Sequence, residues 1–165
     1  MGSPFTKEDH KMFAPACKEI SRLAKYDSNS GEIRQQLDGN MDLRDYLSSV
    51  REWDGEVCTI WHYWNPPLHS ASVWNSLGNM TILVRDYHMC VNAVWKYSSN
   101  NEASSMTPLF YAIWNNQLEA VEKLLALGAD PMIGGTYHGQ DFANARMVAE
   151  YLNRHEIVQH LKDGE

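Results

Sequence analysis

Cysteine and histidine side chains at two places in the chain are of the types that bind zinc. Cys58 and His62 are separated by three residues, and His88 and Cys90 by one. Thiolate and imidazole groups suit tetrahedral zinc, so these four residues are candidate ligands. The spacing is not that of a standard zinc knuckle, and a packed cysteine commonly serves as a small hydrophobic residue. We therefore expect no metal ligands and no cofactor.

Motifs for catalysis or phosphate binding give little support for an enzyme. Cys17 and one of the seven histidines could form a nucleophilic pair, but no local motif marks an activated thiol. Gly134 and Gly135 belong to neither a G-x-G-x-x-G nor a G-x-x-x-x-G-K-[ST] pattern, so no phosphate-binding loop is indicated. We expect no catalytic residues.

Aromatic side chains are better candidates for a functional surface. Trp and Tyr bury a large area with little loss of rotamer freedom, and they are enriched where proteins bind one another. The candidate partner-binding residues are Trp53, Trp61, Trp74, Trp114, Asn115, Gln117, Tyr137 and Tyr151. The alternative interpretation is that the rings fill gaps in an irregular core and that the polar residues only form turns.

Length and charge narrow the classes of function. A chain of 165 residues with 44% apolar residues is long enough for one globular domain. The net charge of −7 argues against binding nucleic acid or an anionic membrane, and it favours a partner with a basic surface. The charged N-terminal segment, the lack of a membrane-spanning apolar run and the three scattered cysteines predict an intracellular, cytoplasmic protein.

The elements that would position these side chains are clearest between residues 106 and 131. Thr107 is a natural N-cap and Pro108 a natural first helical residue, so a short helix is predicted from Pro108 to the Asn115-Asn116 pair. A second helix is predicted from Leu118, with apolar residues on one face and charged residues on the other. Gly128 is its expected C-cap. The segment is therefore a pair of antiparallel helices.

This helix pair resembles an ankyrin repeat. The resemblance rests on Thr107-Pro108-Leu109, on Ala112, and on Leu124-Leu125 followed by Gly128-Ala129-Asp130. Phe110 stands where the family usually has a histidine, and Asn116 where it usually has a glycine. The missing histidine normally forms a hydrogen bond to the neighbouring unit, so we expect this repeat to be held more by packing.

Ankyrin repeats are stable only when several stack side by side, so further copies are expected. Downstream, Ala149 precedes Glu156 by the interval that separates Ala112 from Glu119. Upstream, the residues from Pro67 reproduce the start of the repeat, with the family's histidine present as His69. The expected units are residues 66–106, 107–143 and 144–165, preceded at residues 1–62 by a helical cap or degenerate repeat with a finger insertion, in which Ala24 marks the inner helix.

The resemblance implies an all-α fold, an ankyrin-repeat solenoid of helix-turn-helix units with finger loops. One β-hairpin insertion is expected around Asp54-Gly55, which is flanked by alternating apolar residues. A helix over residues 42–50 is the competing interpretation of the residues that precede this turn.

The resemblance also implies a function: the family binds other proteins through its fingers and the concave face of its inner helices, without catalysis. The expected surface combines the finger at residues 53–64, the turn at 114–117, the finger at 132–138, Trp74 and Tyr151. Exposed aromatic residues would also allow a homodimer. The short, irregular stack resembles stand-alone proteins that viruses or bacteria use against host signalling or as toxin inhibitors.

The alternative function comes from the segment without resemblance. Residues 5–64 could be a small enzyme or a zinc-binding module, with the repeats as a substrate-binding arm. About sixty residues are few for an independent catalytic core, which favours the binding protein.

Overall fold

The computed structural model describes residues 5–54, 65–99 and 102–163. Its α-helices are α1 (Lys7–Leu23), α2 (Ser30–Asp38), α3 (Met41–Ser49), α4 (Pro67–Val73), α5 (Leu77–Thr81), α6 (Pro108–Trp114), α7 (Leu118–Ala126), α8 (Ala145–Tyr151) and α9 (His155–Asp163). A 3₁₀ turn covers Asp27–Asn29, and a π-helical turn (Ile82–Asp86) extends α5. The strands are β1 (Glu52–Asp54), β2 (Val94–Ser99), β3 (Glu102–Met106), β4 (Gly135–Tyr137) and β5 (Gln140–Phe142).

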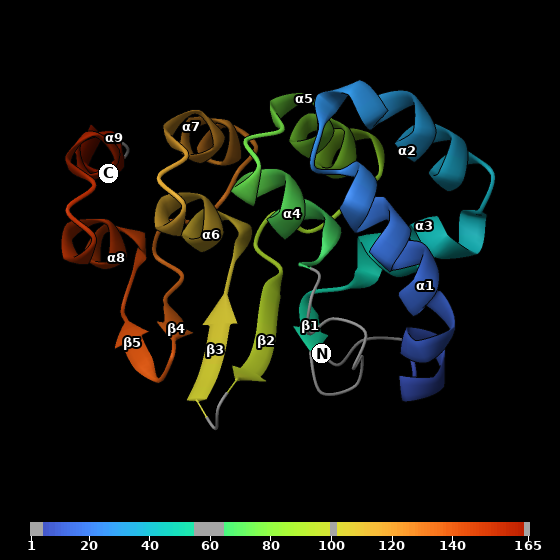
Figure 1. The fold of residues 1–165 in the computed structure, drawn as a ribbon, viewed down its shortest axis with the longest axis horizontal. Helices are drawn as coiled ribbons and strands as arrows, with labels where there is room; N and C mark the ends of the chain where they lie inside the picture. The colour runs from blue at the N-terminus through green and yellow to red at the C-terminus, as the bar shows by residue number, and fades with distance from the viewer. Residues whose placement is uncertain (1–4, 55–64, 100–101, 164–165) are drawn as a thin grey trace.

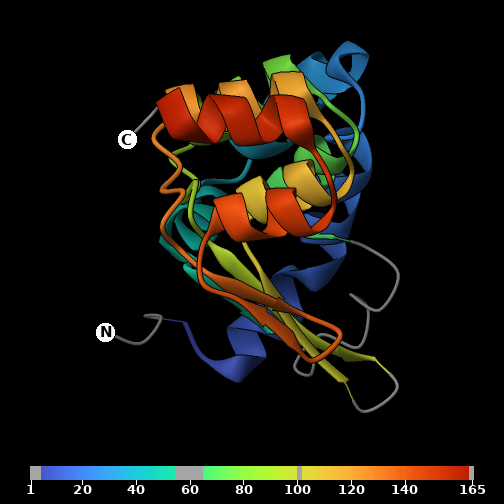
Figure 2. The ribbon, with the colours of Figure 1, turned by 90° about the vertical axis from the view of Figure 1, so that its left-hand side faces the viewer.

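The helices form two layers, and the strands extend from one of them. The inner layer contains α1, α4, α6 and α8, each in contact with the next, and α5, α7 and α9 form the outer layer (Figure 1). In Figure 2 the strands run away from the inner helices toward one side, so that helices and sheet enclose a concave face. Three helix pairs thus lie side by side: α4 with α5, α6 with α7, and α8 with α9.

The same turn joins the two helices of each of these pairs. Its central residue is an asparagine in the left-handed conformation: Asn75, Asn116 and Asn153, with φ of 56°, 56° and 57°. The amide that follows donates to the carbonyl of a buried alanine five residues back, in Ala71, Ala112 and Ala149, at 2.8–2.9 Å. Asparagine adopts this conformation more readily than other residues with a side chain, so Asn116 replaces the expected glycine without changing the turn.

We expect Asn116→Ala to lower the free energy of unfolding by roughly 1–2 kcal/mol, because alanine adopts the left-handed conformation at a steric cost that asparagine partly offsets by local hydrogen bonds. Asn116→Gly should change it by less than about 0.5 kcal/mol, since glycine accepts this φ freely. Urea unfolding of the two variants tests this. Equal losses in both would mean that the asparagine side chain, rather than its φ, stabilises the turn.

The all-α prediction is wrong, because a five-stranded sheet runs along the base of the helix pairs in the order β1-β2-β3-β4-β5. Strands β2 and β3 form an antiparallel hairpin, as do β4 and β5, and Ser105 pairs with Thr136 where the two hairpins meet. The amide of Gly139 also donates to the Ala103 carbonyl at 3.0 Å. The finger loops leave backbone groups unpaired within one unit, so neighbouring fingers satisfy each other by forming a sheet.

The hairpin predicted at Asp54-Gly55 stays a prediction, because Gly55 lies outside the described residues. Strand β1 pairs in parallel with β2, with Trp53 opposite Trp95, so its partner is remote in sequence. The other arm of the predicted hairpin lies in residues 55–64, outside the described residues. The competing helix is confirmed as α3, whose first turn is capped by Asn40: the Leu43 amide donates to its side-chain oxygen at 3.0 Å.

The elements predicted from the clearest segment are confirmed. Thr107 caps α6 by accepting from the Phe110 amide at 3.3 Å, and Gly128 follows α7 with φ of +96°. Phe110 is fully buried and meets the Phe142 ring edge-on, 5.8 Å between centroids. The position that lacks the family's histidine is therefore filled by apolar packing. In the preceding unit His69 keeps its bond, with Nε2 3.0 Å from the Met106 carbonyl oxygen.

Candidate partner-binding surface on the concave face

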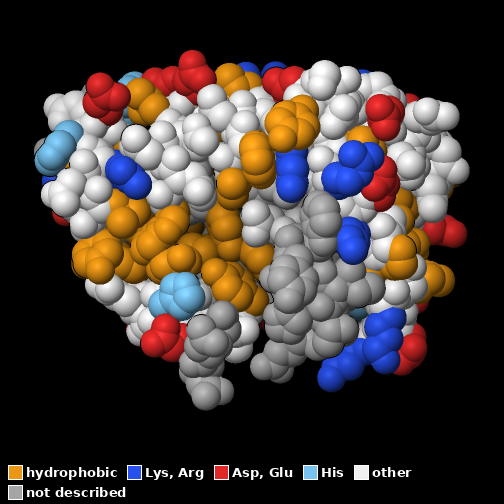
Figure 3. All heavy atoms as spheres, viewed as in Figure 1, with side chains coloured by type: hydrophobic (Ala, Val, Ile, Leu, Met, Phe, Trp, Pro, Cys, Tyr) orange, Lys and Arg blue, Asp and Glu red, His pale blue; other side chains and the backbone are white. Residues whose placement is uncertain are grey.

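Apolar side chains gather on the concave face, over the ends of the inner helices and the adjoining strands (Figure 3). We use the term aromatic surface for the rings that these elements contribute: Tyr97 from β2, Tyr111 and Trp114 from α6, Tyr137 from β4, and Tyr151 from α8. Tyr151 is 54% exposed, Tyr97, Trp114 and Tyr137 are half-buried, and Tyr111 forms the buried floor.

The rings of the aromatic surface support one another across three elements. The centroids of Trp114 and Tyr137 are 3.7 Å apart, so the end of α6 packs directly on the β4 finger. Tyr111 stacks on the buried Trp95 at 5.7 Å, and Tyr97 lies against the same indole at 4.5 Å. Rings fixed by such contacts lose little conformational freedom when a partner covers them, which favours binding.

The tyrosine hydroxyls add hydrogen-bonding groups to this apolar surface. Burial raises the pKa of Tyr111 far above its ordinary value, and the nearby Tyr97 hydroxyl, a hydrogen-bond partner, adds to the shift. Burial also raises the pKa of Tyr137, with Tyr97 again contributing. Both hydroxyls are thus neutral at physiological pH. They can both donate and accept hydrogen bonds in contact with a partner.

The local repeat geometry places the two outermost rings. Trp114 and Tyr151 are the last residues of α6 and α8, each two positions before the left-handed asparagine, so they leave the helices at corresponding points. The Tyr151 ring contacts Phe142 at 5.3 Å, and Arg154 donates to the Trp114 carbonyl oxygen at 3.2 Å. The helix pair α8–α9 thereby contacts and supports the edge of the aromatic surface that α6 contributes.

Trp74 does not belong to this set, although it was among the predicted partner-binding residues. It stands one position before Asn75, so Val73 is the true counterpart of Trp114. Trp74 is 48% exposed and turns toward the N-terminal helices, with Tyr26 at 5.6 Å and the Lys25 ammonium 5.2 Å from its ring centroid. Its ring contacts are thus with the N-terminal segment rather than with the rings of the aromatic surface.

Three other predicted residues serve the fold. Trp53 is only 4% exposed and packs edge-on against Tyr46 at 6.0 Å, so the prediction that it contacts a partner conflicts with its burial. Gln117 donates from Nε2 to the Val73 carbonyl at 2.9 Å and so links neighbouring helix pairs. Asn115 is exposed and donates to the Tyr111 carbonyl at 2.9 Å, which ends α6. Trp61 lies outside the described residues.

Sequence reasoning missed Tyr97, although a signal for it exists. The order Trp95-Lys96-Tyr97-Ser98 alternates aromatic and polar residues, which is typical of a strand with both rings on one face. It also missed a contact at the finger rim, where the His138 ring lies 3.2 Å from the Glu102 carboxylate. No strand was predicted over residues 94–99, so this alternation was not used.

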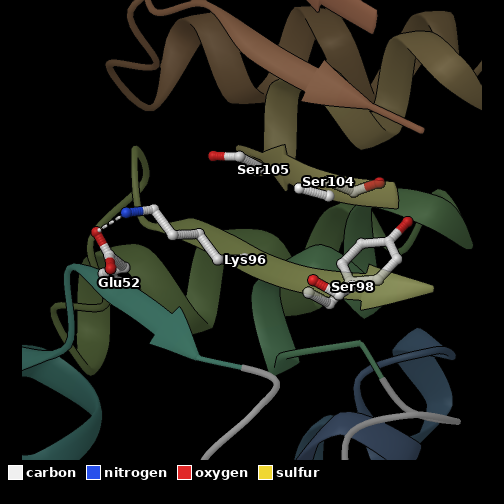
Figure 4. A pocket seen from close by; sticks show the side chains of 7 residues that line it. Glu52, Lys96, Ser98, Ser104 and Ser105 are labelled. Atoms are coloured by element: carbon white, nitrogen blue, oxygen red, sulfur yellow. Dashed lines mark ion pairs between the residues drawn. The ribbon is translucent and has the colours of Figure 1, made fainter. Parts of the chain in front are cut away.

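A second hollow lies on the sheet, over residues of β1, β2 and β3 (Figure 4). It is lined by Glu52, Lys96, Tyr97, Ser98, Ala103, Ser104 and Ser105. The Lys96 ammonium lies 2.8 Å from the Glu52 carboxylate, so the charges of this hollow neutralise each other. Among the lining residues there is no histidine to activate a serine hydroxyl.

The described residues contain no group of three or more His, Cys, Asp or Glu side chains that could hold a metal ion. Cys58 and His62, two of the candidate zinc ligands, lie outside those residues. Cys17 is fully buried within α1, and its thiol cannot reach a substrate in solvent. No helix in the described part of the chain is long and apolar enough to cross a membrane.

Residues 105–135 match the family model of the ankyrin repeat. The match begins in β3, includes the whole of α6 and α7, and ends at the start of β4. The same segment supplies Tyr111 and Trp114, so the matched unit contributes the centre of the aromatic surface.

Proposed function

Because this chain carries an ankyrin repeat at residues 105–135, and such repeats generally mediate protein–protein interaction, we propose that it binds a partner protein through the aromatic surface. The observation that carries this proposal is the exposure of rings that are held rigidly in place. Tyr151 offers more than half of its surface to solvent, and Trp114 is fixed on Tyr137. Rigid, partly exposed Trp and Tyr side chains are typical of binding hot spots.

We extend the repeat assignment to the neighbouring helix pairs as part of the proposal. The pairs α4–α5 and α8–α9 share the left-handed asparagine turn with α6–α7, which supports units at residues 66–106, 107–143 and 144–165. Helices α1 and α2 occupy the place of a further unit, but a 3₁₀ turn (Asp27–Asn29) lies between them. This supports assigning residues 1–62 to a degenerate first unit with a finger insertion, and the whole stack to a short solenoid.

Loss of a partner in an affinity capture experiment tests the proposal. The immobilised native protein and the Trp114→Ala, Tyr151→Ala double variant are exposed to the same cell lysate, and captured proteins are quantified by mass spectrometry. A partner held by the aromatic surface should bind the variant roughly thirtyfold or more weakly, since hot-spot truncations cost about 2 kcal/mol or more. The folding of the variant is checked by circular dichroism and thermal unfolding.

Met41→Ala provides the matched control, because Met41 is 72% exposed at the start of α3 and lies outside the aromatic surface. The control should capture the same partner as the native protein. A partner that binds the well-folded double variant as strongly as the native protein would contradict the proposal and would direct attention to the outer face of the sheet.

A further inference from the structure

Two rings elsewhere in the protein are covered by cations of the chain itself. The Lys25 ammonium lies 5.2 Å from the Trp74 ring centroid, and the Arg44 guanidinium lies 5.5 Å from that of Tyr87. A cation over the face of an aromatic ring is attracted by the negative potential of the π system. In the described parts of the chain, no lysine or arginine is placed in this way over a ring of the aromatic surface. The exposed rings of that surface are therefore available to a cation from outside.

The elements around the aromatic surface carry more acidic than basic side chains. On β2, β3, α6, β4, β5 and α8 the charged residues are Lys96, Arg146, Glu102, Asp141 and Glu150. Lys96 pairs with Glu52 at 2.8 Å, and Arg146 pairs with Glu150 at 2.8 Å. Within the described residues, Glu102 and Asp141 have no lysine or arginine partner. The charge that is left uncompensated around this surface is therefore negative.

Glu102 lies beside the aromatic surface, to which a series of direct contacts connects it. Its carboxylate is 3.2 Å from the His138 ring, which meets the Tyr137 ring edge-on at 4.3 Å between centroids. Tyr137 in turn packs on Trp114 at 3.7 Å. In Figure 3 a His side chain lies at the lower edge of the apolar side chains, with an acidic side chain next to it. The Glu102 side chain is 53% exposed, so it offers a carboxylate at the rim of the aromatic surface.

The aromatic surface also provides hydrogen-bond acceptors for a donor from outside. Tyr97 shares a hydrogen bond with Tyr111, but a phenol oxygen has two lone pairs and can accept again, as can that of Tyr137. Arg154, which follows α8, donates to the Trp114 carbonyl oxygen at 3.2 Å, and no hydrogen bond within the described residues joins it to a phenol. These oxygens can therefore receive a donor that the partner supplies.

We infer that the partner presents an arginine side chain, whose guanidinium packs on the exposed parts of Trp114 and Tyr137 with the Glu102 carboxylate nearby. This inference rests on the proposed function and specifies the chemistry of the partner. Arginine suits the surface better than lysine, because its planar guanidinium stacks on rings, is more weakly hydrated and carries five N–H donors. The net charge of −7 favours the approach of a cationic segment.

Selection from a phage library of random dodecapeptides tests this inference on the intact protein. Peptides that bind the native chain should be enriched in arginine. The strongest is synthesised with a fluorescent label, and its affinity is measured by anisotropy at about 0.15 M salt. A second version carries citrulline in place of arginine, which keeps the shape of the side chain and removes its charge. The native protein should bind the citrulline peptide roughly tenfold more weakly.

Trp114→Leu locates the arginine on the protein, because leucine keeps an apolar side chain at this position but has no aromatic face. On this variant the tenfold preference for arginine over citrulline should fall below about threefold, since the charge and the ring no longer interact. Trp74→Leu is the matched control: the Trp74 ring already holds the Lys25 ammonium, so the preference should stay unchanged. Circular dichroism and thermal unfolding check that both variants are folded.

Glu102→Gln tests the acidic rim with a change that an exposed side chain tolerates. The variant should bind the arginine peptide about threefold more weakly, and raising the salt should reduce this difference. Asp45→Asn removes one negative charge from α3, which packs against α1 and α2, and should change the affinity by less than about 1.5-fold. Equal effects of the two variants would mean that only the net charge of the protein matters.

The results separate the arginine inference from the proposed function. Selected peptides without arginine enrichment that are lost with Trp114→Ala, Tyr151→Ala would overturn the arginine inference and leave the proposed function standing. An unchanged preference for arginine on Trp114→Leu would also overturn the inference. Arginine peptides that bind the double variant as strongly as the native protein would contradict the use of the aromatic surface altogether. A library that yields no binders would contradict both.

Discussion

Phe110→Ala should lower the free energy of unfolding by about 3–5 kcal/mol, the range observed for removing a buried phenylalanine ring. The side chain is fully buried, meets Phe142 at 5.8 Å, and would touch any Cβ added at Gly135, 3.1 Å from the new atom. The ring therefore joins α6, β4 and β5, and its removal leaves a cavity between α6 and the β4–β5 hairpin. Urea unfolding followed by tryptophan fluorescence and circular dichroism measures the loss.

Met132→Ala is the control for this experiment, because Met132 is 64% exposed on the adjoining loop. It should change the stability by less than about 0.5 kcal/mol. A loss below about 1 kcal/mol for Phe110→Ala would show that the units relax around the missing ring. It would also contradict the interpretation that packing substitutes here for the hydrogen bond of the family's histidine.

His69 should make the protein less stable as the pH falls from about 6.5 toward 4. Burial lowers the pKa of this imidazole to about 4 from an ordinary value of 6.5. At high pH the residue is neutral in both the folded and the unfolded chain and has no effect on the pH dependence. Below pH 6.5 only the unfolded chain binds the proton, so stability falls by about 1.4 kcal/mol per pH unit until the folded protein also binds it, roughly 3 kcal/mol in total.

Comparison with His69→Gln isolates this effect, because glutamine can donate to the Met106 carbonyl but does not titrate. The free energy of unfolding of both proteins is measured from pH 8 to about 4. The native protein should lose roughly 3 kcal/mol more than the variant over this interval. Parallel curves would contradict the assignment and would place the acid sensitivity in other groups.

The central repeat could be predicted from the sequence because its determinants are local. Thr107, Pro108 and Gly128 act on backbone groups within a few residues, and their effects on helix ends do not depend on remote contacts. The apolar periodicity of the second helix likewise identifies its buried side. For the same reason the positions of Trp114 and Tyr151 near the ends of inner helices follow from the residues around them.

The formation of the sheet depends on pairing between segments that are distant in the sequence. So does the burial or exposure of individual aromatic side chains. Trp53 lies beside Trp95 only because β1 joins β2 in parallel, and nothing near residue 53 specifies that partner. Tyr97 and Tyr137 face the same surface because two fingers from different units lie side by side. Because Trp74 is displaced by one residue relative to the turn that follows it, its ring contacts the Lys25 side chain instead of joining the aromatic surface.

The sequence by itself determined the helix pair at residues 108–126 and the chemical character of its exposed end, since caps, turns and amphipathic periodicity are encoded by near neighbours. Only the tertiary structure decided that the fingers form a sheet, that Trp53 is buried, and that rings from α6, β2 and β4 pack against one another on one surface. Composition gives only the total charge and carries no information about contacts between segments remote in sequence. Binding depends on which side chains the packed helices present together on one face.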